Sequence, residues 1–132
     1  MRLTILGVLS VLMMGAVLNS CGSKGGGTAE ATLAVTLTPP NGSTQAISPG
    51  PFGVAVQITS TMPPKGVTIA ITAEVDGTSS PFYTTSGSSS TATNSFSITN
   101  TPAQETCVVN VTVTSNTEAS NVYTGSYRYS AK

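Results

Sequence analysis

The stretch Val67-Thr68-Ile69-Ala70-Ile71-Thr72-Ala73-Glu74-Val75 decides the fold class of this 132-residue chain. Every second side chain is apolar, so valine, isoleucine and alanine fall on one side and mostly polar residues fall on the other. This period of two is that of a β-strand with one buried face, and five alternations in a row exclude a helix. Gly66 precedes the stretch and Asp76-Gly77 follows it, as turns do. The stretch therefore predicts a core built from strands.

The same alternation recurs on both sides of this central strand. Turn residues such as proline, glycine and asparagine separate the segments that show it, which are 32–38, 52–59, 95–99, 107–114 and 121–130. Residues 78–94 consist mainly of serine, threonine and glycine, and they predict a long loop with room for one short edge strand. Cys107 begins a run of inward valines, where a free cysteine behaves as a small hydrophobe.

Six strands and a doubtful seventh predict an all-β fold, a single β-sandwich of about seven antiparallel strands over residues 31–132. The pattern resembles the immunoglobulin-like and fibronectin type III domains. The chain has no tryptophan and only two cysteines, Cys21 and Cys107. The resemblance therefore implies a relative that lacks the disulfide of antibody domains. A barrel of similar strand number is the structural alternative.

The first twenty residues have the layout of a signal peptide. Arg2 supplies a positive charge, residues 5–18 are almost continuously apolar, and the polar pair Asn19-Ser20 ends the apolar run. A membrane-spanning helix needs about 20 predominantly apolar residues, so this run is too short to be one. We expect residues 1–20 to be cleaved.

The next motif, Leu18-Asn19-Ser20-Cys21, resembles the lipobox of bacterial lipoproteins. The resemblance implies cleavage between Ser20 and Cys21, a diacylglycerol on the Cys21 thiol and an acyl chain on its new amino group. No other cofactor is expected. The competing interpretation is an ordinary secreted protein in which Cys21 keeps its thiol.

Residues 21–30 are rich in glycine and predict a flexible linker between the lipidated cysteine and the domain. Position 22 is glycine, whereas an acidic residue there resembles an inner-membrane retention signal. The resemblance therefore implies a lipid-anchored protein of the bacterial cell envelope, in the outer membrane, with the periplasmic face favoured slightly over the cell surface.

Composition excludes several classes of function. The chain has five basic residues, five acidic residues and no histidine. Without a basic surface we expect no nucleic-acid partner. Without histidine the commonest general base and zinc ligand are missing, so we expect neither an enzyme nor a metal site. Glu74 and Asp76 lie two apart at a strand end, but two carboxylates fall far short of the roughly six to eight oxygens that calcium takes.

The weak candidates for a binding surface are aromatic. Tyr123, Tyr127 and Tyr129 share one face of the last predicted strand, where they would either face outward as a contact row or fill the core. Phe82 and Tyr83, in the predicted loop, are the second candidate.

The sequence as a whole predicts a non-catalytic structural or protein-interaction module. Its expected partners are the membrane, through the lipid anchor, and another envelope protein or a glycan. The alternative is a carbohydrate-binding or adhesive module that uses an exposed tyrosine row. The sequence leaves the oligomeric state open.

Overall fold

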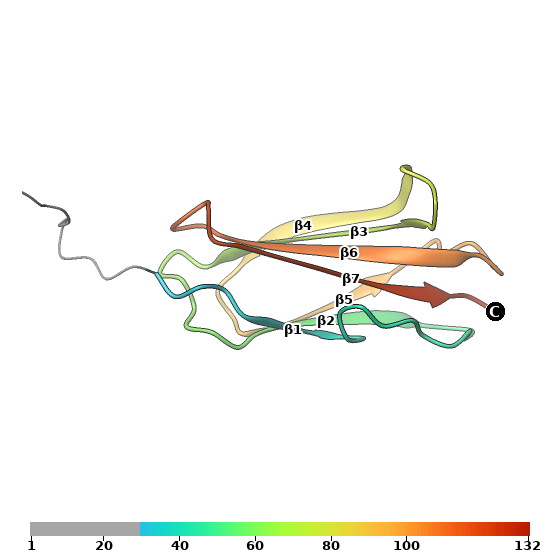
Figure 1. Ribbon diagram of the computed structural model, residues 1–132, viewed down its shortest axis with the longest axis horizontal. Helices are drawn as coiled ribbons and strands as arrows, with labels where there is room; N and C mark the ends of the chain where they lie inside the picture. Colours follow the sequence, from blue (N-terminus) through green and yellow to red (C-terminus); the bar gives the residue numbers. More distant parts are fainter. Residues whose placement is uncertain (1–29) are drawn as a thin grey trace, which may run out of the picture.

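The computed structural model describes residues 30–132, which fold into a β-sandwich of seven strands in two layers (Figure 1). The strands are β1 (Val35–Thr38), β2 (Phe52–Ile58), β3 (Val67–Val75), β4 (Pro81–Ser89), β5 (Thr93–Ile98), β6 (Thr106–Ser115) and β7 (Val122–Ser130). One sheet has the order β1-β2-β5 and the other the order β4-β3-β6-β7. All neighbouring strands pair antiparallel, which confirms the predicted fold class.

The predicted signal peptide, the lipobox and most of the predicted linker lie outside the described residues. Within residues 30–132, no helix is long and apolar enough to cross a membrane.

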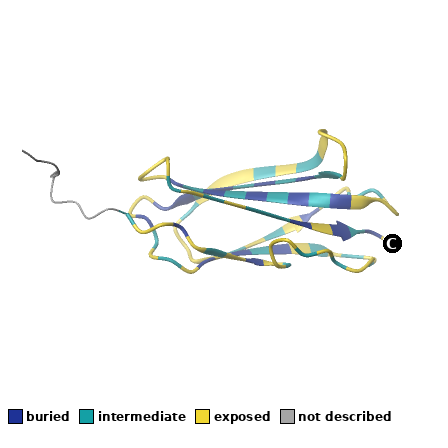
Figure 2. Cartoon of the chain, in the orientation of Figure 1, coloured by how far each residue is buried: buried dark blue, intermediate teal, exposed yellow. Residues whose placement is uncertain are grey.

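The central strand of the larger sheet is β3, the stretch with the clearest alternation. It pairs with β6 along its whole length, so Ile69 lies opposite Val113 and Ile71 opposite Val111. Its inward side chains from Val67 to Ala73 are fully buried and belong to one core cluster with inward residues of the other sheet. Figure 2 shows how buried and less buried residues alternate along the strands. Burial of each such aliphatic side chain contributes roughly 1.5–3 kcal/mol, so the inner faces of the two sheets supply most of the hydrophobic stabilisation.

One prediction about the strands is wrong in extent. Residues 78–94 are not a long loop with a short edge strand, because β4 spans nine residues and pairs with β3. A β-bulge between Ala73 and Glu74 adjusts the register at one end of this pairing. An edge strand is held by backbone hydrogen bonds on one side, so it needs little apolar alternation. The Ser/Thr/Gly composition of β4 therefore concealed it.

The described chain begins at one end of the sandwich, where Asn121 holds it. The Asn121 amide nitrogen Nδ2 donates to Glu30 Oε1 at 2.7 Å and to the Ala31 carbonyl at 2.8 Å, and Asn121 Oδ1 accepts from the Leu33 backbone at 2.9 Å. Glu30, which the sequence placed at the end of the linker, thus contacts the domain. The C-terminus lies at the opposite end (Figure 1).

The segment between β1 and β2 crosses to the other sheet and covers the edge of β7. It does so with backbone hydrogen bonds that join Gly42 to Ser126 at 2.7 Å, Gln45 to Arg128 at 2.8 Å and Ser48 to Ser130 at 3.1 Å. Bridges in this segment are parallel to β7. The segment therefore shields an otherwise open sheet edge and forms a fixed wall at the C-terminal end of β7.

Candidate functional site

The tyrosine row of β7 points into the sandwich. Tyr127 and Tyr129 are each 3% exposed, and Tyr123 is half-buried beside Gly125. The outer side of the same strand carries the exposed Thr124. The row therefore fills the interior and does not form the outward aromatic platform that the carbohydrate-binding alternative required.

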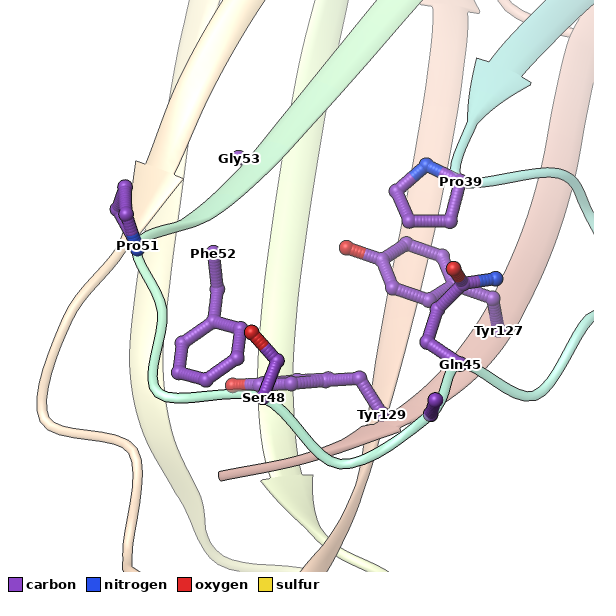
Figure 3. A pocket seen from close by; sticks show the side chains of 9 residues that line it. Pro39, Gln45, Ser48, Pro51, Phe52, Gly53, Tyr127 and Tyr129 are labelled. Atoms are coloured by element: carbon purple, nitrogen blue, oxygen red, sulfur yellow. The ribbon is translucent and has the colours of Figure 1, made fainter. Parts of the chain in front are cut away.

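A hollow opens where two of these tyrosines approach the surface, between the start of β2, the end of β7 and the segment between β1 and β2 (Figure 3). Its volume is about 190 Å³. The lining residues are Pro39, Gln45, Ala46, Ser48, Pro51, Phe52, Gly53, Tyr127 and Tyr129, none of which is charged. A second hollow of about 320 Å³ shares Pro51 and Phe52 with it.

Aromatic rings form the floor of the first hollow. The centroids of Phe52 and Tyr129 are 4.7 Å apart with the planes tilted by 49°, and those of Tyr127 and Tyr129 are 6.3 Å apart at 48°. Tilted pairs at such distances are favourable arrangements of aromatic rings. The Tyr129 hydroxyl also bonds the Thr101 hydroxyl at 2.6 Å, so this ring is held at both its face and its tip.

The Tyr127 hydroxyl differs from that of Tyr129. Figure 3 shows it directed toward the middle of the hollow, and no side chain or backbone group of residues 30–132 hydrogen-bonds it. Burial raises the pKa of Tyr127, and the neighbouring Tyr129 raises it further. The hydroxyl is therefore protonated at neutral pH and is free both to donate and to accept a hydrogen bond.

Two polar side chains stand at the rim. Gln45 Nε2 donates to Ser43 Oγ at 2.9 Å, which leaves the amide oxygen of Gln45 without a donor among the described residues. Ser48 Oγ accepts from the Gly50 backbone at 3.1 Å, and its own proton has no acceptor in that part of the chain. Both residues are half-buried. The hollow thus combines apolar walls with three available polar groups.

The other chemical candidates from the sequence have structural partners. Asp76 Oδ2 accepts from Arg128 Nε at 3.0 Å, and Glu74 Oε1 accepts from Asn110 Nδ2 at 3.4 Å. No group of three His, Cys, Asp or Glu side chains within residues 30–132 is placed to hold a metal ion.

Cys107 lies fully buried in the core with a free thiol, as the sequence predicted. Burial raises the pKa of this thiol, and the charge of Glu105 raises it further. Since the thiolate is the reactive form of cysteine, the thiol is unreactive in the folded domain.

Phe82 and Tyr83 do not belong to the hollow. They lie at the start of β4, half-buried and packed against the core. Of the predicted aromatic residues the structure therefore brings only Tyr127 and Tyr129 together at a concave surface.

Sequence reasoning missed the rest of the lining. Gln45 and Ser48 lie in a segment without periodicity, whose composition predicts only turns. The one available signal was the set of prolines that brackets this segment, at positions 39, 40, 49 and 51. These show that the segment is neither a strand interior nor a helix, but not that it folds back onto β7.

Comparison of the chain with protein-family models, with curated proteins and with solved structures found no match.

Proposed function

We propose that this chain is a lipid-anchored, non-catalytic interaction module of a bacterial cell envelope. The observation that carries the proposal is the sequence Leu18-Asn19-Ser20-Cys21 directly after an apolar leader. A diacylglycerol on Cys21 would hold the protein at a bilayer surface, because each buried methylene contributes about 0.8 kcal/mol and two acyl chains anchor almost permanently. The expected location is the outer membrane, with its periplasmic face favoured.

The end of the sandwich at which the described chain begins is consistent with this proposal. The described chain begins at one end of the sandwich, and β7 ends at the other (Figure 1). The hollow is lined by Tyr127 and Tyr129, which lie near that far end of β7. A tether attached at residue 30 would thus leave the hollow turned away from the membrane. The partner is another envelope protein or a glycan.

The absence of histidine supports a non-catalytic role, because binding needs shape and hydrogen bonds but no general base. The outward tyrosine row is not proposed as the binding surface, since Tyr127 and Tyr129 are buried.

The intact mass of the protein extracted from membranes tests the anchor. The wild-type chain should begin at Cys21 and carry the mass of a diacylglycerol and a further acyl group. Cys21→Ala should abolish both the lipid and cleavage at that position. Cys107→Ala is the matched control, because it removes the other cysteine and should leave lipidation intact. A soluble wild-type chain without lipid contradicts the proposal.

A further inference from the structure

We propose that the hollow lined by Phe52, Tyr127 and Tyr129 binds one residue of a neutral glycan, with Gln45 and Ser48 at its rim as hydrogen-bonding partners. The proposal refines the proposed interaction module by naming its ligand class and site. It depends on the lipid anchor only for the direction that the site faces.

The free hydroxyl of Tyr127 is the first argument. The Tyr127 hydroxyl opens onto the hollow, where water can hydrogen-bond it as long as no ligand is present. Tyr127 is 3% exposed, and its hydroxyl points into the hollow and bonds to no residue in 30–132. A phenylalanine would fill the same space without an unused hydroxyl. The group is therefore placed to serve a ligand or the water that a ligand displaces.

The walls specify the kind of ligand. The face of an aromatic ring is negative, so it attracts the weakly positive C–H bonds on the apolar side of a sugar ring. The half-buried Phe52 supplies such a ring, which packs against the buried Tyr129. Three polar groups stand near it: the Tyr127 hydroxyl, the Gln45 amide oxygen and the Ser48 hydroxyl. A sugar residue has several hydroxyls to satisfy all three. A proline ring of a peptide, the other ligand that aromatic grooves take, offers a single carbonyl acceptor.

The size and the charge of the hollow further restrict the class of ligand. Sites for small molecules usually span roughly 300–1,000 Å³. The volume of about 190 Å³ suits a single sugar ring, and the adjoining hollow of about 320 Å³ provides space for a neighbouring residue of the same glycan. No lining residue of the first hollow is charged, so this hollow itself offers no cationic partner for an acidic sugar, whereas Lys132 lines the second hollow.

The rim is already ordered without a ligand. Backbone hydrogen bonds of 2.8 Å from Gln45 to Arg128 and of 3.1 Å from Ser48 to Ser130 fix it against β7, and Lys132 donates to the Ser48 carbonyl at 2.8 Å. A site ordered in advance loses little conformational freedom when a ligand binds, which favours measurable affinity despite the small contact area.

The test is saturation-transfer NMR and calorimetry on the detergent-extracted protein. The probes are neutral trisaccharides of glucose, mannose, galactose, xylose and N-acetylglucosamine at millimolar concentration. Oligogalacturonate and a proline decapeptide serve as comparison ligands. At least one neutral trisaccharide should bind.

Two variants carry the same chemical change at different places. Tyr127→Phe should weaken binding by about 3- to 10-fold, the effect of one hydrogen bond, while the midpoint of thermal unfolding stays constant or rises because no protein bond is lost. Tyr83→Phe removes a hydroxyl outside the hollow and should bind like the wild type.

Three results would overturn the inference. They are the failure of every neutral trisaccharide to bind, equal binding by Tyr127→Phe and the wild type, and binding of the proline peptide or of the acidic sugar in preference to the neutral ones. Each of these results differs from a failure of the proposed lipid anchor, because the intact mass of the protein tests the anchor separately.

Discussion

Replacement of Gly66 by alanine is expected to be among the most damaging single-methyl changes in this domain. Gly66 is buried in the turn before β3, with a φ of 76° that L side chains rarely adopt. A Cβ atom there would lie 2.5 Å from the backbone oxygen of Ser89 at the end of β4. The left-handed conformation costs about 1–2 kcal/mol. Overpacking against a backbone atom costs a further 1–3 kcal/mol, roughly.

The expected loss for Gly66→Ala is therefore about 2–5 kcal/mol, a large share of the roughly 5–15 kcal/mol that stabilises a domain of this size. Neighbouring backbone hydrogen bonds make relaxation difficult. The Gly66 amide donates to the Pro63 carbonyl at 2.9 Å, and the Gly66 carbonyl accepts from Asn116 at 2.9 Å. Moving the turn away from Ser89 would break at least one of them.

Two further glycines separate the steric from the conformational contribution. Gly77 has a φ of 89° but nothing within 4 Å of its added Cβ, so Gly77→Ala should cost only about 1–2 kcal/mol. Gly87, inside β4, has neither a positive φ nor a close neighbour, so Gly87→Ala should be neutral or stabilising by about 0.5–1 kcal/mol.

Urea unfolding followed by circular dichroism gives all three free energies if the slope of the transition stays constant. The order of stability should be Gly87→Ala, then Gly77→Ala, then Gly66→Ala. Equal losses for Gly66→Ala and Gly77→Ala would refute the contact with Ser89, because both would then report backbone conformation alone.

Three other measurements probe the core and the surface. Raising the pH should lower the free energy of unfolding, because burial raises the pKa of Cys107 and Tyr127 and the unfolded chain releases their protons more readily. The stabilising contribution of Tyr127 should be complete below roughly pH 10 and should fall by up to about 1.4 kcal/mol per pH unit above it. Tyr127→Phe should reduce this dependence when urea unfolding is measured over a series of pH values. Asp76→Asn should cost less than about 1 kcal/mol, and less still in high salt, since Asp76 and Arg128 are half-exposed; a salt-independent loss of several kcal/mol contradicts this. Ile71→Ala should cost about 2–5 kcal/mol because the Ile71 side chain is fully buried in the core cluster, and a loss below 1 kcal/mol would argue against that packing.

The contrast between β3 and β4 shows how far sequence patterns reach. β3 is read directly from residues 67–75, because one face is buried and the other is not, so the alternation of side chains records its orientation. β4 has nearly the same length but consists largely of Ser, Thr and Gly. Its place at the sheet edge depends on backbone pairing with β3, to which every residue type contributes alike. The pattern therefore could not distinguish a strand from a loop there.

The candidate site divides in the same way. The face shared by Tyr127 and Tyr129 follows from their spacing on one strand, but spacing does not say whether that face is inner or outer. The second sheet decides this by covering it. Gln45 and Ser48 come from a segment that carries no period at all, and Phe52 begins a strand of the opposite sheet.

The sequence by itself determined the order and character of the main strands and the burial of Cys107, because each of these is written in local composition or in a period of two residues. The proposed lipid anchor also rests on sequence alone, on the motif Leu18-Asn19-Ser20-Cys21. Only the tertiary structure decided that β4 is a full strand, that the tyrosines face inward, and that the segment between β1 and β2 turns back onto β7 to make a hollow. These features depend on contacts between residues distant in the chain, whose free energies no local pattern records.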